Sequence, residues 1–313
     1  MKELPLVTIC MPTYNHEPYI EAAILSVISQ EYSNIKLIIS DDCSTDNTYN
    51  IVSAYEEKYP DLIHAQRHDK NLGIMQNVKS IYPLITGKYV CWFSGDDLFY
   101  PEKIKNQVYL MESNPNCIFS FHATDVISNV SKFLYEFNDP SLGAKLHLHN
   151  ISNNLLDNRC FICAISVMIN RNLAANIQHV ENAGACSDWL MLFELSNRGS
   201  VLYMPETLAS YRRHANNISK SLSITNEESI YHYVLNNYPN YKRSVYKGLS
   251  QLYCMYIFKY LLAKNFTMSL YCCKKLLQVA VISPSNIPAL FMKVCSELVK
   301  RLKLLVITGN VIR

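Results

Sequence analysis

The chain has 313 residues, of which 49% are hydrophobic and 18% charged, a balance typical of a folded protein and not of a disordered one. The formal net charge of +3 is too small to indicate a nucleic-acid partner. The eleven cysteines, an odd number, are expected to be reduced thiols of a cytoplasmic protein, and a strand directly after the start argues against a signal peptide. Lysine or proline interrupts every long apolar run, so no membrane-spanning helix is expected.

Predicted strands and helices alternate through the first hundred residues. Short apolar runs rich in β-branched and aromatic residues predict strands, and amphipathic segments between them predict helices. The expected strands are 6–11, 35–40, 62–66 and 89–93, and the expected helices are 17–30, 47–58 and a segment from residue 74 to residue 84. This alternation predicts βαβ units in an α/β fold with a mixed, mainly parallel sheet flanked by helices.

Three polar loops follow predicted strands, at residues 12–16, 41–46 and 94–97. The carboxyl ends of parallel strands meet at one edge of a sheet, where open α/β sheets bind ligands, so we expect the three loops to gather there. Asp96 and Asp97 end the fourth strand. Two adjacent carboxylates suit Mg²⁺ or Mn²⁺ that also binds phosphate oxygens, and the alternative is a solvated turn with a helix-capping aspartate.

The first loop, at residues 12–16, lacks the glycine pattern of a phosphate-binding loop, so side chains and a metal ion would have to hold a nucleotide. Asp42 is a candidate to accept a hydrogen bond from the imide of a base, with Tyr14 packed on the ring. The alternative for Asp42 is a helix-capping role in its loop.

Four segments together resemble glycosyltransferase family 2, whose members have the GT-A fold. They are VTICMPTYN at 7–15, SDDCSTDNT at 40–48, NLG at 71–73 and SGDDL at 94–98, in matching order and spacing. Each segment is short, and the set of four carries the resemblance, which covers about residues 5–220.

The resemblance assigns roles to the polar loops. It implies that three residues lie around the uridine of a UDP-sugar: Pro12, Tyr14 and Asp42. It also implies that Asp96 contacts the ribose or the sugar, and that Asp97 binds the divalent metal on the diphosphate. Many family members carry a further acid where this chain has Ser94, which leaves open which carboxylates share the metal.

The middle of the chain is expected to form the acceptor side of the site. We expect a variable loop at 128–149 and a strand at 159–169. Asp188 precedes a helical apolar pattern and is either a first-turn acid or, as the resemblance implies, the catalytic base. The family usually has an acidic pair there, whereas this chain has Ser187 beside the acid. Trp189 is interpreted either as core or as an apolar wall for the acceptor sugar.

A Tyr-Arg-x-His run at residues 211–214 resembles the segment that closes the family's catalytic domain. The resemblance implies that Arg213 reaches the diphosphate and that His214 is a second metal ligand, with Arg212 as another candidate for the diphosphate. The alternative is a basic turn at the surface.

We therefore predict a GT-A catalytic domain at 1–220, with a nucleotide-sugar half at about 1–100 and an acceptor half at about 101–220. A helical C-terminal region at 221–313 should contain helices at 248–264, 267–281 and 286–305. That region either packs on the catalytic domain or a second copy, or forms a basic amphipathic surface that lies peripherally on the inner face of the cytoplasmic membrane.

The predicted activity is an inverting glycosyl transfer from a UDP-sugar donor, with Mg²⁺ or Mn²⁺, to a saccharide acceptor on a lipid diphosphate, in O-antigen or capsule synthesis. Inversion follows because an acceptor hydroxyl attacks opposite the leaving diphosphate. Two alternatives are a non-catalytic module that binds a nucleotide-sugar or a partner, and a nucleotidyltransferase. The latter would need a loop rich in glycine and basic residues after the first strand.

Overall fold

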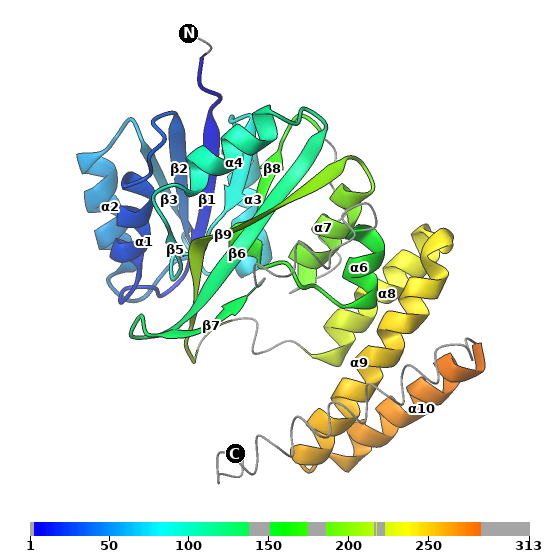
Figure 1. The fold of residues 1–313 in the computed structure, drawn as a ribbon. Helices are drawn as coiled ribbons and strands as arrows, with labels where there is room; N and C mark the ends of the chain where they lie inside the picture. Colours follow the sequence, from blue (N-terminus) through cyan, green and yellow to red (C-terminus); the bar gives the residue numbers. More distant parts are fainter. Residues whose placement is uncertain (1–2, 138–150, 175–185, 216, 218–222, 283–313) are drawn as a thin grey trace. The chain divides into compact units, whose positions relative to one another are not determined.

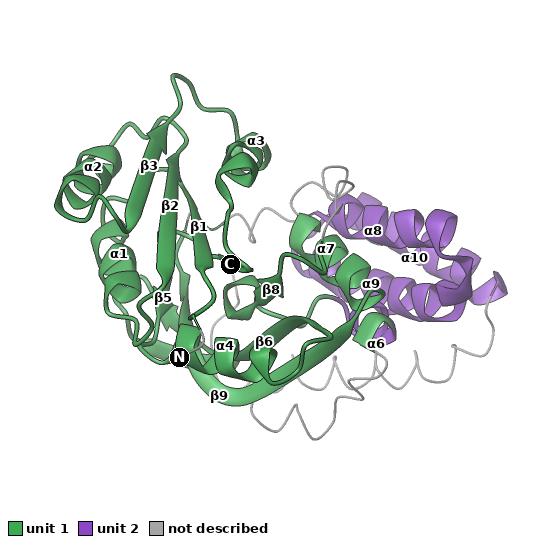
Figure 2. Ribbon diagram, turned by 90° about the horizontal axis from the view of Figure 1, so that it is seen from above, with its two compact units in different colours: residues 1–152, 160–221 green, residues 153–159, 222–313 purple. Residues whose placement is uncertain are grey.

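A computed structural model describes residues 3–137, 151–174, 186–215, 217 and 223–282 (Figure 1). The chain divides into two compact units, which are coloured separately in Figure 2. The first unit contains residues 1–152 and 160–221, and the second contains residues 153–159 and 222–313. None of the helices in the described ranges is long and apolar enough to cross a bilayer.

A mixed β-sheet forms the centre of the first unit. Its spatial order is β3-β2-β1-β4-β8-β6-β9-β5, with β7 paired to β6. The strand bounds are β1 (Val7–Thr13), β2 (Ile35–Asp41), β3 (Ile63–Arg67), β4 (Tyr89–Trp92), β5 (Leu98–Phe99), β6 (Cys117–Ser128), β7 (Phe133–Phe137), β8 (Met168–Asn170) and β9 (Ser200–Arg213).

Helices flank this sheet and make up the second unit. Those of the first unit are α1 (Ile20–Ile28), α2 (Thr48–Lys58), α3 (Ile74–Ile81), α4 (Lys103–Glu112) and α7 (Ser187–Ser196), and α6 (Ile151–Asp157) crosses the unit boundary. Those of the second unit are α8 (Ile224–Asn237), α9 (Lys242–Leu262) and α10 (Phe266–Ile282). Short 3₁₀ turns occur at Tyr82–Leu84, Ala164–Ser166 and Pro239–Tyr241.

The predicted α/β architecture is confirmed. β1 pairs in parallel with both β2 and β4, and β2 pairs in parallel with β3. β1 is buried almost throughout, as expected for a central strand covered on both faces. One face carries the larger core cluster, which includes Ile9, Leu37 and Cys91, and Cys10, Ile38 and Val90 lie in a smaller cluster.

Two segments in the middle of the chain differ from the sequence prediction. The start of the expected loop at 128–149 contains β7, which pairs antiparallel with β6. Four of the five residues of β7 are exposed, so the strand lacks the alternation of buried and exposed residues that identifies a half-buried strand. The expected strand at 159–169 is mostly irregular. The positive φ of 63° at Arg159 prevents a strand from beginning there, a 3₁₀ turn follows at Ala164–Ser166, and only the end of the segment is extended, as β8.

In the second unit, α9 covers most of the helix expected at 248–264 and buries part of one face. Leu249, Leu252, Tyr253 and Tyr256 of α9 are buried. Gly248 is required where α9 meets α6, because a Cβ there would collide with the carbonyl oxygen of Leu156 and with a tyrosine ring of α8. The helix expected at 286–305 lies outside the described residues.

Candidate functional site

The three polar loops gather at one edge of the sheet, as the parallel pairing requires. Thr13 and Asp41 are register partners at the ends of β1 and β2. The backbone N–H of Asp42 donates to the carbonyl oxygen of Thr13 at 2.9 Å, and that of Phe93 donates to Cys10 at 2.9 Å. The loops after β1, β2 and β4 therefore start side by side.

Hydrogen bonds join the first two loops directly. The Asn15 N–H donates to Ser44 Oγ at 2.9 Å, and Asn15 Oδ1 accepts from the Thr45 N–H at 2.9 Å. Asn15 has a φ of 53°, a left-handed conformation that asparagine tolerates better than most residues. The Ser44 N–H donates to Asp41 Oδ2 at 3.0 Å. These bonds explain why short polar residues occupy both loops.

Asp42 closes the turn that precedes α3. Its Oδ1 accepts from the Leu72 N–H at 2.7 Å and its Oδ2 from the Gly73 N–H at 2.9 Å. Gly73 has a φ of 80°, which a glycine adopts without strain. The carboxylate is buried, yet each oxygen retains a second lone pair. The same side chain can thus hold this turn and accept a further donor.

The other two residues predicted at a nucleoside lie on the same loop edge. Pro12 is the penultimate residue of β1 and is partly buried. Tyr14 follows the strand and is 42% exposed, so its ring is accessible from solvent. Their roles toward a nucleotide stay predictions.

Asp96 and Asp97 are both buried at the end of the loop after β4. His214 lies beside them, with Nε2 2.7 Å from Asp96 Oδ2. Burial raises the pKa of Asp96, but the hydrogen bond with His214 and the nearby His16 outweigh burial and lower it overall. Asp96 is therefore held as a carboxylate.

Asp97 has the opposite balance. Its Oδ1 accepts the Arg212 backbone N–H at 2.8 Å. Burial and the negative charge of Asp96 raise the pKa of Asp97 well above its usual value, against the smaller lowering effect of Arg212. Ionisation of both aspartates is therefore costly at this position, and a nearby cation would lower that cost.

The adjacent arginines at the end of β9 lie in different surroundings. Arg212 is buried, with Nε donating to the Asp96 carbonyl oxygen at 2.7 Å and a terminal nitrogen donating to Ser131 Oγ at 2.9 Å. Its guanidinium carbon is 5.0 Å from the centre of the Tyr19 ring. Arg213 is exposed and donates to the Tyr135 hydroxyl at 3.1 Å. The structure therefore brings Arg212, and not Arg213, against the aspartates.

Sequence reasoning missed His16 and Tyr19 as neighbours of this cluster. The rings of Tyr19 and His214 are 5.1 Å apart, and those of His16 and His214 are 6.4 Å apart. Burial lowers the pKa of His16, although the charge of Asp96 opposes the shift. The presence of a histidine in the loop after the first strand could have indicated that His16 belongs to this cluster.

The fit of this cluster to a divalent cation rests on its oxygen atoms. Asp96 Oδ1 is buried and receives no hydrogen bond from the residues that the structure describes. No group of three or more histidine, cysteine, aspartate or glutamate residues in those ranges is arranged as a complete metal site. Mg²⁺ and Mn²⁺ need few protein ligands when water and phosphate oxygens supply the rest, so an aspartate oxygen such as Asp96 Oδ1 could serve without a three-residue cluster.

Asp188 lies in the first turn of α7, where sequence analysis placed it. Its Oδ1 accepts the Trp189 backbone N–H at 2.8 Å, which matches the helix-terminus alternative. Burial nevertheless raises the pKa of Asp188. Trp189 is 2% exposed, so its ring belongs to the core of the first unit.

Cys163 is close enough to both Asp97 and Asp188 to respond to their charges. Burial raises the pKa of the Cys163 thiol, and the charges of Asp97 and Asp188 raise it further, so Asp97 and Asp188 share one neighbourhood. Cys160 and Cys163 have a C-x-x-C spacing, which sequence reasoning overlooked although the letters show it. The cysteines in the described ranges are free thiols.

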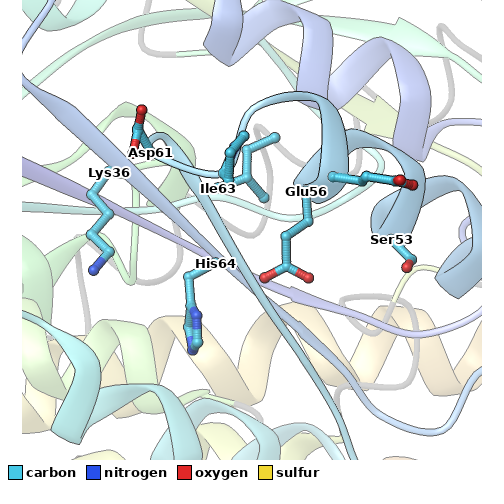
Figure 3. Close-up of a pocket in the computed structure, with 8 residues that line it drawn as sticks. Lys36, Ser53, Glu56, Asp61, Ile63 and His64 are labelled. Carbon is cyan, nitrogen blue, oxygen red and sulfur yellow. The ribbon is translucent and has the colours of Figure 1, made fainter.

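A surface depression of about 690 Å³ lies elsewhere on the first unit (Figure 3). Its lining includes Lys36, Ile63 and His64, at the beginnings of β2 and β3. Because these strands are parallel, the depression is at the opposite edge of the sheet from Asp42. It takes no part in the site described above.

Comparison with known proteins identifies the family. The model of the family described as Glycosyl transferase family 2 matches residues 8–174, more than half of the chain. The chain belongs to glycosyltransferase family 2. A putative teichuronic acid biosynthesis glycosyltransferase of Bacillus subtilis, TuaG, is 31% identical over 221 residues, which cover 69% of this chain and 82% of that protein. Uncharacterised mycobacterial relatives are 30% identical over 213 residues, and the match spans 58% of their length.

Solved structures confirm the GT-A fold. S. aureus TarS in complex with UDP-GlcNAc superposes with a TM-score of 0.66 at 15% identity, over 88% of this chain and 81% of that one. A mannosyltransferase from Pyrobaculum calidifontis, in complex with GDP-Man and Mn²⁺, gives a TM-score of 0.58 at 15% identity, over 97% and 81%. At these identities the likeness concerns the fold alone.

Proposed function

We propose that this chain is an inverting, metal-dependent glycosyltransferase that moves a sugar from a UDP-sugar to a saccharide acceptor. The observation that carries the proposal is the buried pair Asp96 and Asp97 at the carboxyl edge of the sheet, where Asp96 Oδ1 receives no hydrogen bond from the described residues. A cation at that edge would make it easier for both aspartates to be ionised and could bind the diphosphate as well. A divalent ion, Mg²⁺ or Mn²⁺, would stabilise the charge that develops on the leaving diphosphate.

The residues divide into a donor group and an acceptor group. Asp97 and His214 would hold the cation, and Asp96 would lie at the ribose or the sugar. Pro12, Tyr14 and Asp42 would surround the uracil; the exposed Tyr14 ring and the remaining lone pairs of Asp42 support this assignment. Arg213, an exposed cation that follows Arg212 at the end of β9, is a candidate contact for the diphosphate.

Asp188 is proposed as the catalytic base on the acceptor side. Its elevated pKa suits a carboxylate that must accept a proton from a hydroxyl group, since a more basic carboxylate is a better proton acceptor. Its shared neighbourhood with Asp97 supports a place near the reacting carbon. Attack by the acceptor opposite the diphosphate would invert the anomeric centre, with oxocarbenium character on the sugar ring.

The acceptor is proposed to be a saccharide on a lipid diphosphate, in the synthesis of a surface polysaccharide such as O-antigen or capsule. The name of the relative TuaG supports a role in polysaccharide synthesis. An acceptor of this kind would place the protein at the inner face of the cytoplasmic membrane.

A donor screen tests this proposal. Purified protein with Mn²⁺ is incubated with UDP-GlcNAc, UDP-glucose, UDP-galactose or GDP-mannose and a lipid-diphosphate saccharide, and released nucleotide and product anomer are measured. We expect turnover with a UDP-sugar, an inverted product, and loss of turnover in Asp188→Asn with UDP binding retained. Turnover with GDP-mannose alone would contradict the UDP assignment, and a retained anomer would contradict the proposed mechanism.

A further inference from the structure

The outer face of α10 carries large apolar side chains. Phe266, Leu270, Leu277 and Val281 are 63%, 69%, 68% and 82% exposed. Their spacing places them on one side of the helix. They form what we call the α10 stripe, and α10 itself lies alongside α9 in Figure 1.

The inner face of α10 has the reverse composition. Its buried residues are Ser269, Cys272 and Val279, none larger than a valine, whereas the stripe includes a phenylalanine and two leucines. Ser269 Oγ donates to the Ile257 carbonyl oxygen of α9 at 3.3 Å, which fixes this face against α9. A helix that only packed on its own unit would bury its large apolar residues and expose its small ones. The arrangement of α10 therefore indicates that the stripe contacts an apolar partner outside its own unit.

The charges around the stripe select the partner. Seven lysine and arginine residues, and no acidic residue, occur between residues 229 and 282. Lys264, at the turn before α10, and Lys274, within α10, are exposed. A surface that is both apolar and basic complements an anionic lipid interface, where the stripe enters the acyl boundary and the lysines remain at the headgroups.

The same charges disfavour the other occupants of the stripe. A second copy would bring the same basic segment against itself. Residues 283–313 carry five lysine or arginine residues and a single acid, Glu297, so they too would meet like charge. An anionic bilayer offers apolar surroundings together with opposite charge.

We propose that the α10 stripe is an interfacial membrane-binding face that recognises anionic lipid. The inference deepens the proposed function and rests on it, because a lipid-linked acceptor lies in a membrane. It assigns the contact to one face of one helix.

The test is co-sedimentation of the full chain with vesicles, in the absence of donor and metal. Vesicles contain phosphatidylcholine alone or with an equal part of phosphatidylglycerol. We expect binding to the anionic vesicles only, weakening as salt is raised. Leu270→Glu with Leu277→Glu should lower the partition coefficient at least tenfold, and Lys274→Gln should lower it about fivefold. Tyr109→Glu with Val130→Glu, at exposed apolar residues of the first unit, is the matched control and should bind as wild type.

Three results would overturn the inference: no binding of wild type to anionic vesicles, unchanged binding of the α10 double variant, or a wild-type dimer in light scattering that the double variant splits. Leu270→Ala with Leu277→Ala is the second variant, should the glutamates disturb folding. UDP titration of the same proteins separates the two proposals. If a variant no longer binds vesicles but still binds UDP, the proposed transfer reaction is unaffected. If wild type binds vesicles but does not bind UDP, the assignment of the α10 stripe is unaffected and the proposed function fails.

Discussion

The backbone N–H of Arg212 donates to Asp97 Oδ1 at 2.8 Å, although the two residues are 115 positions apart in the chain. The same residue donates from Nε to the carbonyl oxygen of Asp96 at 2.7 Å. The end of β9 therefore fixes both aspartates from one side. This bond sets the position of Asp97, and the charge of the guanidinium partly offsets the effect of burial on its pKa.

Replacement of Arg212 should disrupt this arrangement. In Arg212→Ala the backbone bond to Asp97 can persist, but the loop after β4 loses the guanidinium that anchors it. We expect kcat/KM to fall at least a hundredfold and the free energy of unfolding to fall by about 2–3 kcal/mol. Arg212→Lys should recover only part of the loss, because lysine lacks the planar fork.

The adjacent Arg213 supplies the matched control. It is exposed and makes a bond to Tyr135, so Arg213→Ala should leave the free energy of unfolding within about 0.5 kcal/mol of wild type. Any effect on KM for the donor would then report contact with the diphosphate. Equal destabilisation by the two alanine variants in urea unfolding would contradict the assignment of Arg212.

Asp42 offers a second test, because its two oxygens hold two different N–H groups. Asp42→Asn replaces one oxygen by an NH₂ group that cannot accept from Leu72 or Gly73. The turn before α3 should loosen, with a loss of about 1–2 kcal/mol in unfolding free energy and at least tenfold weaker UDP binding. Asp61→Asn, an exposed acid at the opposite edge of the sheet, is the control. Unchanged UDP affinity in Asp42→Asn would remove Asp42 from the nucleotide site.

The raised pKa of Asp188 predicts the direction of the pH dependence. A base is active when deprotonated, so kcat/KM should rise with pH up to the pKa of Asp188 and then level off. Because burial raises that pKa, the rise should extend above the usual range of an aspartate. Asp188→Asn should lower kcat by about 10²–10⁴ and abolish this limb of the profile. A pH profile that keeps the same limb in the variant would assign the titration to another group.

We expect the stability of the second unit to depend on the ion pair between Arg159 and the buried Glu227. Arg159 Nε donates to Glu227 Oε2 at 2.6 Å, and the Tyr256 hydroxyl donates to Glu227 Oε1 at 3.0 Å. Glu227→Gln should lower the free energy of unfolding by about 2–3 kcal/mol, because it removes the charge that these donors face. Glu206→Gln, at an exposed acid, should be near neutral. Urea unfolding followed by helical circular dichroism measures both, and a neutral Glu227→Gln would show that the ion pair contributes little.

The parallel strands, and the edge of the sheet at which the polar loops gather, were predictable from the sequence. Both depend on local features, namely the spacing of apolar residues and the position of polar loops. β1, β2 and β4 lie where short apolar runs indicated them, and Asp96 and Asp97 end up beside the loops after β1 and β2. The parallel geometry alone then brings the three loops together.

Other features depend on contacts that no local pattern encodes. The sequence presents Arg212 and Arg213 as equivalent neighbours, and only the alternation of β9 turns one inward and the other outward. β7 was missed because it pairs along β6 without a buried face of its own. The proximity of Cys163 to both Asp97 and Asp188 is likewise a tertiary relation among three segments.

The most direct test of the central claim is isothermal titration of UDP into wild type and Asp97→Ala, each with and without Mn²⁺. We expect wild type to bind UDP tightly only with Mn²⁺, and Asp97→Ala to lose the metal-dependent part of the binding while remaining folded. UDP binding that is the same with and without Mn²⁺, or that survives in Asp97→Ala at full strength, would contradict a metal-bridged diphosphate at this pair of aspartates.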